Sequence, residues 1–373
     1  MSSPGTLIKW PGGKTREIKQ IEYLIPEFDR YVEPFFGGGA MFFHVRPEHA
    51  LINDVSKELT DFYALVKAQD ADFKQYLLAY ASLWGDLLLL CDRQYDQILA
   101  LYEKMEHKQQ GSLPADIRTL VDSVAGQLPS SETKLLLLDG EAYRTRLCQS
   151  VWDKFCRTQK NEEKAPFNDE DLKENLITGF TSGTYLYFRD VYNDILLERG
   201  GAVSTACRVA NYYFIREYCY GSMFRYNVKG EFNIPYGGMS YNRKDFRAKI
   251  REIFSEDTKQ LFQGTEIHCK DFEEFFSSCE LKETDFMFLD PPYDTDFSDY
   301  EGRAFTQEDQ RRLAEALKKT KAGFILVIKN TDFIYSLYEH DFHILCFDKT
   351  YTYNVRSRNE RKVEHLIITN LLV

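Results

Sequence analysis

Short apolar runs that end at acidic, glycine or proline residues indicate buried strands near both ends of the chain. Phe286 to Leu289 predicts a strand that stops at Asp290, and Phe324 to Ile328 predicts another buried strand. His343 to Phe347 and His365 to Thr369 have the length and composition expected of the last two strands. The pattern therefore predicts one sheet whose strands come from both ends of the chain.

Helical spacing dominates the middle of the chain, from about residue 66 to residue 207. Apolar side chains recur there every three or four positions, as in Phe73, Tyr76, Leu77, Tyr80 and Leu83. The segment carries 22 acidic and 16 basic residues, a net charge of −6, which is typical of solvated helices and not of a DNA-binding surface. A further helix is expected over residues 306–320, capped by Thr306 with Asp309 at its third position.

Composition narrows the class of protein. With 373 residues, 43% of them hydrophobic, the chain is long enough for two or more cores. Its net charge of −11 gives no global sign of nucleic-acid binding, so any DNA contact has to come from local patches. Its eight cysteines form no C-x-x-C pair, which argues against a zinc site or disulfides. The N-terminus is no signal peptide and the apolar runs are too short to cross a bilayer, so we expect a cytoplasmic protein.

The stretch with the clearest chemistry is Asp290-Pro291-Pro292-Tyr293. It follows a predicted strand, and ligands of open α/β sheets bind at the carboxyl ends of strands. The Asp290 carboxylate can accept hydrogen bonds from an NH2 group, and proline, which has no N–H, offers its carbonyl as a second acceptor. With the Tyr293 ring as a stacking face, these groups suit a planar amine such as adenine N6. The alternative is an ordinary strand-end turn.

A glycine-rich turn near the N-terminus predicts a cofactor that contains a nucleoside. Residues 31–39 read as a strand followed by three glycines, with an apolar helix running on to Val45. Asp54 follows the next apolar pair, where an acid binds ribose hydroxyls in such folds. The turn is not G-x-G-x-x-G, and alone it is a weak signal. Residues 7–14 hold a second glycine turn, whose alternative interpretation is a plain loop before a helix.

Residues 208–251 reverse the charge of the chain, with nine basic residues against three acidic ones. Aromatic residues interleave with these cations, and Arg225 to Tyr236 reads as a hairpin that turns near Lys229-Gly230. A basic, aromatic hairpin suits a DNA groove, but a charged surface meander explains the pattern equally well. A second basic patch, at Arg356, Arg358, Arg361 and Lys362, is expected either to touch phosphates or to be a solvated loop.

Taken in order, these motifs make the chain resemble the Dam-type family of DNA adenine-N6 methyltransferases, the D12 class in its α arrangement. Glu33-Pro34-Phe35 with Gly37 and Gly39 is similar to the family's glycine loop, and Asp290 to Tyr293 to its Asp-Pro-Pro-Tyr motif. The other matches are Lys9-Trp10 with Gly12-Gly13-Lys14, then Asn53-Asp54, then Tyr213-Phe214 through Gly237, and finally Glu364 to Asn370.

The resemblance implies an α/β fold, a Rossmann-like S-adenosylmethionine-dependent methyltransferase sheet with a mainly helical target-recognition insertion and a β-hairpin. Residues 1–65 and 252–373 would form the two parts of the catalytic domain. Residues 66–251 would form the helical insertion and target-recognition region, with the hairpin at about 220–240. S-adenosylmethionine would be the cofactor, held by Trp10, Lys14, Glu33, Phe35, Gly37, Gly39, Asp54, Asp271, Phe272 and Asp290.

The resemblance also implies the reaction. The target adenine would be flipped out of duplex DNA, with Tyr293 stacked on it and with the Asp290 carboxylate and the Pro291 carbonyl accepting its N6 hydrogens. Pro292 completes the set of expected catalytic residues. The DNA-binding residues would be Tyr220, Arg225, Asn227, Lys229 and Asn233. No metal is expected. Because Tyr220-Gly221-Ser222 departs from the Tyr-Asn-Gly usual in the family, GATC is only one candidate target sequence.

Two alternatives stay open on the sequence alone. The same chemistry could act on RNA, or a catalytically silent relative could bind DNA without methylating it, although the intact Asp290 motif and glycine loop argue against silence. The expected partner is double-stranded DNA, in a restriction–modification role with a cognate endonuclease or in a phage or orphan methylation role. We expect a monomer or weak dimer with no membrane contact.

Overall fold

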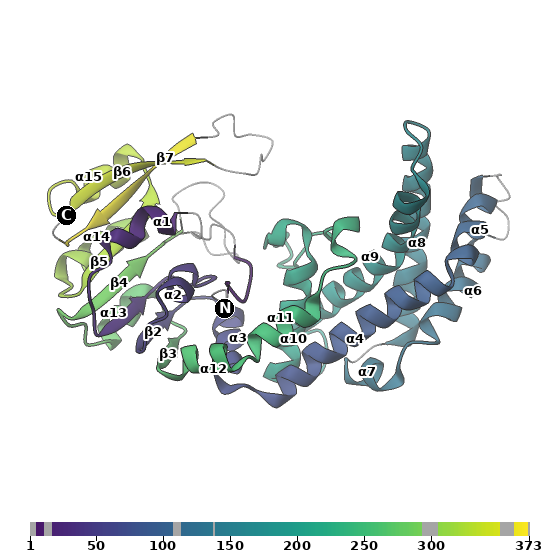
Figure 1. Ribbon diagram of the computed structural model, residues 1–373, viewed down its shortest axis with the longest axis horizontal. Helices are drawn as coiled ribbons and strands as arrows, with labels where there is room; N and C mark the ends of the chain where they lie inside the picture. The colour runs from purple at the N-terminus through teal and green to yellow at the C-terminus, as the bar shows by residue number, and fades with distance from the viewer. Residues whose placement is uncertain are drawn as a thin grey trace. The chain divides into compact units, whose positions relative to one another are not determined.

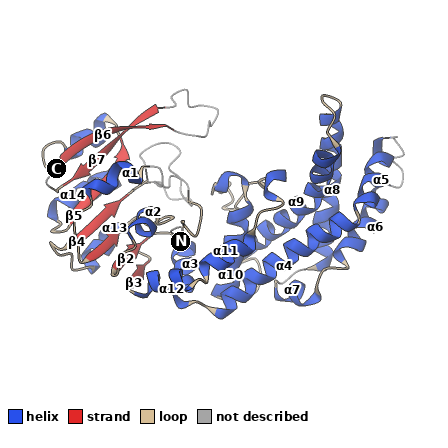
Figure 2. Ribbon diagram, viewed as in Figure 1, coloured by secondary structure: helices blue, strands red, loops and turns tan. Residues whose placement is uncertain are grey.

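The computed structural model describes residues 5–10, 17–106, 113–136, 139–292, 305–350 and 362–371. Contacts along the chain group it into two compact units. The first comprises Met1–Ala68 and Phe254–Val373, and the second is the single stretch Gln69–Ile253. All seven strands belong to the first unit, and the second is helical (Figure 2).

A seven-stranded sheet forms the centre of the first unit, with strand order β3-β2-β1-β4-β5-β7-β6 (Figure 1). The strands are β1 (Arg30–Glu33), β2 (Ala50–Asn53), β3 (Thr265–His268), β4 (Asp285–Leu289), β5 (Gly323–Lys329), β6 (His343–Thr350) and β7 (Lys362–Thr369). Strands β1 to β5 pair in parallel, whereas β7 is antiparallel to both β5 and β6. The order of the parallel strands reverses at β1 and β4, which are neighbours although the whole second unit lies between them in sequence.

The strands expected from apolar runs are confirmed. β4 ends at Leu289, directly before Asp290, and all five of its residues are buried. β5, β6 and β7 contain the three C-terminal strands read from the sequence. The expected helix at 306–320 is α14 (Gln307–Lys319), and Thr306 and Asp309 form its capping box.

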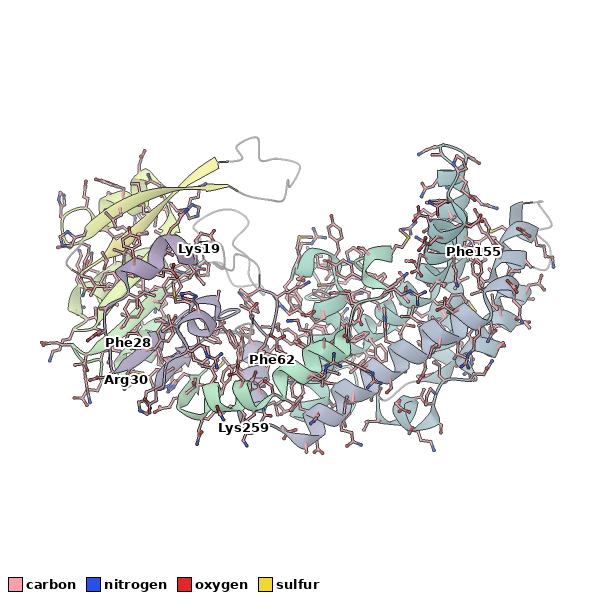
Figure 3. The ribbon with its side chains drawn as sticks, viewed as in Figure 1. Lys19, Phe28, Arg30, Phe62, Phe155 and Lys259 are labelled. Atoms are coloured by element: carbon pink, nitrogen blue, oxygen red, sulfur yellow. The ribbon has the colours of Figure 1, made fainter. Side chains whose placement is uncertain are left out.

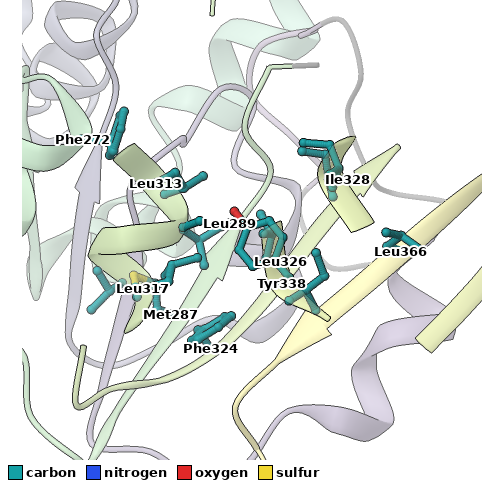
Figure 4. Close-up of a cluster of buried hydrophobic side chains, with 14 of the residues drawn as sticks. Phe272, Met287, Leu289, Leu313, Leu317, Phe324, Leu326, Ile328, Tyr338 and Leu366 are labelled. Atoms are coloured by element: carbon teal, nitrogen blue, oxygen red, sulfur yellow. The ribbon is translucent and has the colours of Figure 1, made fainter. Parts of the chain in front are cut away.

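Helices cover both faces of the sheet. On one face, α13 (Phe272–Ser278), α14 and α15 (Asp332–Tyr338) pack on β4 and β5 through the cluster drawn in Figure 4, which includes Met287, Leu289 and Phe324. On the other face lie α2 (Ala40–Val45), α3 (Lys57–Ala68) and α12 (Glu256–Gln263). Phe42 of α2 contacts both Tyr31 of β1 and Phe262 of α12. The short α1 (Ile18–Ile21) and η1 (Glu22–Leu24) precede β1.

An ion pair fixes the start of the two central strands. Arg30, labelled in Figure 3 near Phe28, donates from Nε and Nη2 to the two carboxylate oxygens of Asp285, at 3.0 and 2.6 Å. Asp285 is buried, and the Phe28 ring lies 5.6 Å from that of Phe286. Since Arg30 and Asp285 are register partners, the pair aligns β1 with β4.

The second unit consists of helices, as the spacing at 66–207 predicts. They are α4 (Ala71–Arg93), α5 (Tyr95–Glu106), α6 (Leu113–Ala125), α7 (Ser130–Leu135), α8 (Gly140–Glu162), α9 (Asp169–Leu196), α10 (Thr205–Tyr218) and α11 (Phe246–Ile253), with the short η2 (Tyr220–Ser222) and η3 (Met239–Tyr241). Asp70, Asp139, Asn168 and Ser204 cap α4, α8, α9 and α10 with their side chains. Gln69 Nε2 donates to the Ile253 carbonyl at 3.2 Å, so the two ends of the unit lie together.

A β-bridged loop stands where the sequence predicts a hairpin. Isolated antiparallel bridges join Cys219 to Tyr236 and Tyr226 to Phe232, and the chain turns at Gly230, whose φ is +76°. The turn near Lys229-Gly230 is thus present, but its two arms pair at single points instead of forming regular strands. No helix within the described residues is long and apolar enough to cross a membrane.

Candidate functional site

The site lies where the order of parallel strands reverses. β1 and β4 pair in register from Arg30 with Asp285 to Val32 with Met287, so both strands end at one edge of the sheet. The loops that follow them begin at Pro34 and at Asp290. Ligands of open α/β sheets bind in the crevice at such a switch point. Four of the ten residues expected to hold the cofactor, Phe35, Gly37, Gly39 and Asp290, are on these two loops.

Hydrogen bonds from the end of β2 shape the glycine loop. Asp54 accepts the Gly37 N–H at 2.9 Å through Oδ2 and the Ser56 N–H at 2.9 Å through Oδ1. Tyr63 of α3 donates its hydroxyl to the Gly37 carbonyl at 3.1 Å. Asp54, expected to bind a ribose, therefore organises the glycine loop.

The glycines of this loop meet a conformational and a steric requirement. Gly37 and Gly39 have φ values of +50° and +64°, in the left-handed region. A Cβ at Gly37 would stand 2.7 Å from Cδ1 of Trp10, and one at Gly39 would stand 2.5 Å from Cζ of Phe36. Trp10, expected near the cofactor, thus packs directly on the glycine backbone.

Asn53 joins three loops at this edge of the sheet. Its side-chain amide donates to the carbonyls of Pro34 and Lys270, both at 3.0 Å, and its Oδ1 accepts the Lys270 N–H at 3.0 Å. Its own carbonyl accepts the Phe36 N–H at 2.9 Å. Asn53 was matched in the sequence only as the neighbour of Asp54. Its position at the end of a buried strand is the only sequence signal of this role.

Three carboxyl groups, those of Glu33, Asp54 and Asp290, influence one another's charge. Glu33 is buried, and Tyr31 donates its hydroxyl to Glu33 Oε2 at 2.8 Å. Burial raises the pKa of Glu33 well above its usual value, and the charges of Asp290 and Asp54 raise it further, against the opposing effect of the Tyr31 hydrogen bond. A cationic ligand would relieve this repulsion.

Aromatic rings form a wall beside the loop. Phe35 lies 5.6 Å from Phe272 and 5.7 Å from Phe305, centroid to centroid. Asp271 caps α13 by accepting the Glu273 N–H at 3.0 Å. Asp271 and Phe272, both expected near the cofactor, therefore come from one helix start, and Phe35 from the glycine loop meets them.

Arg312 of α14 fixes this helix start. Its guanidinium donates to Asp271 at 2.7 Å and to Asp309 at 2.8 Å, pairs with Glu273 at 2.8 Å, and lies 4.9 Å from the centroid of the Phe272 ring. Sequence reasoning missed Arg312, since a single arginine on an exposed helix face carries no distinguishing signal.

The Asp-Pro-Pro stretch leaves the sheet at the end of β4. Asp290 is half-buried, Pro291 buried and Pro292 half-buried. Gln310 of α14 donates its Nε2 to the Pro292 carbonyl at 3.1 Å. Tyr293 and Lys14, two other residues singled out in the sequence, lie outside the described residues, as do Arg356, Arg358 and Arg361 of the second basic patch.

In the second unit, the turn at 227–231 is held by Asn227. Its Oδ1 accepts the Lys229 and Glu231 N–H groups at 2.8 and 3.1 Å, and its amide donates to Glu231 Oε2 at 3.0 Å. Arg225 donates from Nε to Asn233 Oδ1 at 3.3 Å. Asn227, Asn233 and Glu231 also line a polar cavity of about 330 Å³. Arg225 and Lys229 are exposed, and Tyr220 is 55% exposed.

Most of the cations at 208–251 do not form a free basic surface. Arg216 is fully buried, with its guanidinium 4.1 Å from the centroid of the Phe224 ring. Arg243 pairs with Asp92 of α4 at 3.1 Å and Glu174 of α9 at 2.6 Å. Lys249 and Arg251 pair with Glu252 and Asp245. The local charge surplus therefore overstates what is available to a phosphate backbone.

The strand order, the single antiparallel strand and the loops at the switch point define a Rossmann-like methyltransferase fold. The family model for D12 class N6 adenine-specific DNA methyltransferases matches residues 10–105 and 133–353. The chain belongs to this family and is a DNA adenine methyltransferase. The family description names DNA as the substrate, which argues against the RNA alternative.

Named relatives align over nearly their whole length. The chain is 26% identical to Type II methyltransferase M.CviBI of Paramecium bursaria Chlorella virus NC1A, over 98% of each chain. It is 23% identical to Type II methyltransferase M1.LlaDCHI of Lactococcus lactis subsp. cremoris, over 97% of this chain and 94% of the relative. It is also 23% identical to the DNA adenine methylase of Vibrio cholerae serotype O1, over 98% of this chain and 96% of the relative.

Proposed function

We propose that the protein methylates N6 of an adenine flipped out of duplex DNA, with S-adenosylmethionine as methyl donor and Asp290 as the central catalytic residue. The observation that carries the proposal is the meeting of the Glu33 and Asp290 loops at the switch point, where Asp290 and Asp54 both act on the charge of Glu33. As a biological role we propose site-specific modification alongside a cognate restriction endonuclease, on the analogy of the relatives named Type II methyltransferases.

The residues present fit this cofactor. S-adenosylmethionine carries a sulfonium and an ammonium group, and the charges of Asp54 and Asp290 beside Glu33 favour such cations. Glu33 would face the methionine part, Asp54 the ribose hydroxyls, and Asp271 with Phe272 the adenine ring. When bound, the cofactor supplies a methyl group on a positively charged sulfur.

The target adenine would be bound through its amino group. The Asp290 carboxylate and the Pro291 carbonyl would accept the two N6 hydrogens, which draws the nitrogen lone pair out of conjugation with the ring. One of these hydrogens leaves as a proton when the new N–C bond forms, and the carboxylate can receive it. Tyr293 would stack on the extruded base and offset part of the few kcal/mol that flipping costs.

Recognition of the target sequence would fall to the second unit. Arg225 and Lys229 are exposed at the turn that Asn227 holds in shape. We propose that Arg225 contacts base edges or phosphates, that Lys229 contacts phosphates, and that Tyr220 and Asn233 flank them. Asn227 would contribute chiefly by fixing the turn, since its side chain already makes three hydrogen bonds there.

The decisive experiment is single-molecule sequencing of DNA from a methylation-free host that expresses the protein or its Asp290→Ala variant. N6-methyladenine in one short sequence context, absent with the variant, would support both the reaction and the role of Asp290. Methylation that persists with a folded Asp290→Ala protein would overturn the assignment of this residue.

A further inference from the structure

Gln310 is an unusual residue for its position. It belongs to the buried face of α14, with Leu313, Ala314 and Leu317 at the helical spacings i+3, i+4 and i+7, and it is itself fully buried. An amide side chain among leucines is unfavourable unless its polar atoms are bonded. Its Nε2 is bonded, to the Pro292 carbonyl at 3.1 Å, while its Oε1 has no hydrogen-bond partner within the described residues.

The helix that carries Gln310 is firmly anchored. The capping box of Thr306 and Asp309 closes its first turn directly before Gln310. Arg312, two residues further on, pairs with Asp271 and Glu273 at the start of α13. Leu313 and Leu317 pack in the core against the sheet. Gln310 therefore reaches the Pro292 carbonyl from a rigid support.

A hydrogen bond at this carbonyl has more effect than it would on an ordinary loop. The rings of Pro291 and Pro292 already restrict both φ angles to near −65°. The bond to the Pro292 carbonyl restrains the ψ angle of that residue as well. The remaining angle, ψ of Pro291, sets the direction of the Pro291 carbonyl, and it is confined to the extended region because a proline follows. With the Pro292 carbonyl held as well, the Pro291 carbonyl has little freedom of direction.

We propose that Gln310 is a positioning residue for methyl transfer, which holds the Pro292 carbonyl and thereby aims the Pro291 carbonyl and the Asp290 carboxylate at the target amine. The inference rests on the proposed roles of Asp290 and Pro291. It adds a residue that touches neither base nor cofactor but fixes the two acceptors relative to each other. Misplacement of reacting groups by about 1 Å can lower a rate about 100-fold.

The first test is Gln310→Leu, which keeps the volume and removes the donor. We expect kcat to fall about 10- to 100-fold, while KM for S-adenosylmethionine and the Kd for an oligonucleotide duplex stay within about twofold of the native values. A folded Leu variant with native kcat would overturn the proposal, and so would a loss confined to KM.

The second test, Gln310→Glu, follows the pH dependence of one folded variant. It therefore does not require the variant to be as stable as the native protein. A protonated carboxylic acid can still donate to the Pro292 carbonyl, whereas an ionised one repels it. Burial raises the pKa of such a group, so kcat of this variant relative to the native enzyme should fall as pH rises across roughly pH 6 to 9. Gln307→Glu, on the exposed first position of the same helix, is the matched control and should follow the native profile.

Asp290→Ala measured in parallel separates the two levels of inference. If it is inactive and Gln310→Leu is native-like, the proposed function stands and the role of Gln310 is wrong. If Asp290→Ala is active, the proposed function itself fails. A Gln310→Glu profile parallel to that of the native enzyme contradicts the positioning role in either case.

Discussion

At the scale of single residues, Glu33 shows what the fold does to one side chain. Burial and the neighbouring Asp290 and Asp54 keep its carboxyl protonated at pH values where a free glutamate would be charged, despite the opposing hydrogen bond from Tyr31. The native state therefore holds a proton that the unfolded chain releases. The stability that this bound proton contributes is fully present below the ordinary carboxyl pKa. It is lost as pH rises towards the raised pKa of Glu33.

Replacement of Glu33 by Gln should remove this pH dependence. The amide oxygen can still accept from Tyr31, but the side chain has no proton to lose. Within the window between the two pKa values, the native enzyme should lose about 1.4 kcal/mol of stability per pH unit relative to Glu33→Gln. Urea unfolding of both proteins at several pH values between 4.5 and 8 measures the difference. A constant difference would mean that Glu33 is already ionised in the native state.

The sequence predicted residues whose role depends on local chain geometry. The glycines at 37 and 39 and the acid at 54 fall in a strand–turn–helix pattern, and the structure shows the positive φ values and the backbone hydrogen bond that need them. Arg216 and Arg243 could not be interpreted in the same way. Whether an arginine is buried or paired depends on residues far away in sequence, such as Asp92 and Glu174.

At the scale of elements, α14 has two contacts with the site. Gln310 holds the Pro292 carbonyl, and Arg312 holds Asp271 and lies over Phe272. The helix itself was predictable, since Thr306 and Asp309 give a capping signature. Its two site contacts were not, because they depend on which loops the sheet order brings beside its first turns.

Loss of the Arg312 guanidinium should weaken cofactor binding. In Arg312→Gln, Asp271 loses its ion-pair partner and Phe272 loses the cation over its ring, so the start of α13 is less well fixed. We expect the Kd for S-adenosylmethionine, measured by isothermal titration calorimetry, to rise several-fold.

Arg311→Gln is the matched control for this prediction. Arg311 is the next residue towards the helix start, pairs with Glu308 of its own helix, and packs on Phe333 of α15. The Arg311→Gln variant should therefore bind S-adenosylmethionine with the affinity of the native protein. Equal losses in both variants would indicate a general effect on α14 and would contradict a specific role of Arg312.

The bridged loop at 219–236 marks the limit of element prediction. Turn residues and alternating aromatics correctly placed its turn, but pairing at single bridges results from packing on the helices behind it. Asn193 of α9 bonds both the N–H and the carbonyl of Phe232. Those backbone groups would otherwise be available to a neighbouring strand.

At the scale of the whole molecule, an acidic chain has to bind a polyanion. The net charge of −11 and the ion pairs of Arg243, Lys249 and Arg251 leave few cations at 208–251 available to phosphates. DNA affinity should therefore depend on few residues. Its decrease with added salt should be shallow, because few phosphates are neutralised.

Arg225→Ala should lower DNA affinity about 10- to 100-fold, the loss expected when a single base-contacting arginine is removed. Affinity for S-adenosylmethionine should remain native, because Arg225 and the cofactor residues belong to different units. Fluorescence anisotropy with a labelled duplex measures the first quantity and calorimetry the second.

Arg251→Ala provides the comparison, since Arg251 is equally exposed but pairs with Asp245. The Arg251→Ala variant should therefore retain the DNA affinity of the native protein. A fall in cofactor affinity in Arg225→Ala, or equal losses of DNA affinity in both variants, would show that the loop has been given the wrong role.

The hydrogen bond between Gln69 and Ile253 has a consequence for how this enzyme can change over time. A segment of more than 180 residues departs from the sheet unit and returns to it at one point. Insertions that begin and end at neighbouring points disturb their host least. The helical unit is therefore organised as an exchangeable insertion. Under the proposed division of roles, a lineage that exchanges it acquires a new target sequence and inherits β2, β3 and the groups at their ends unchanged.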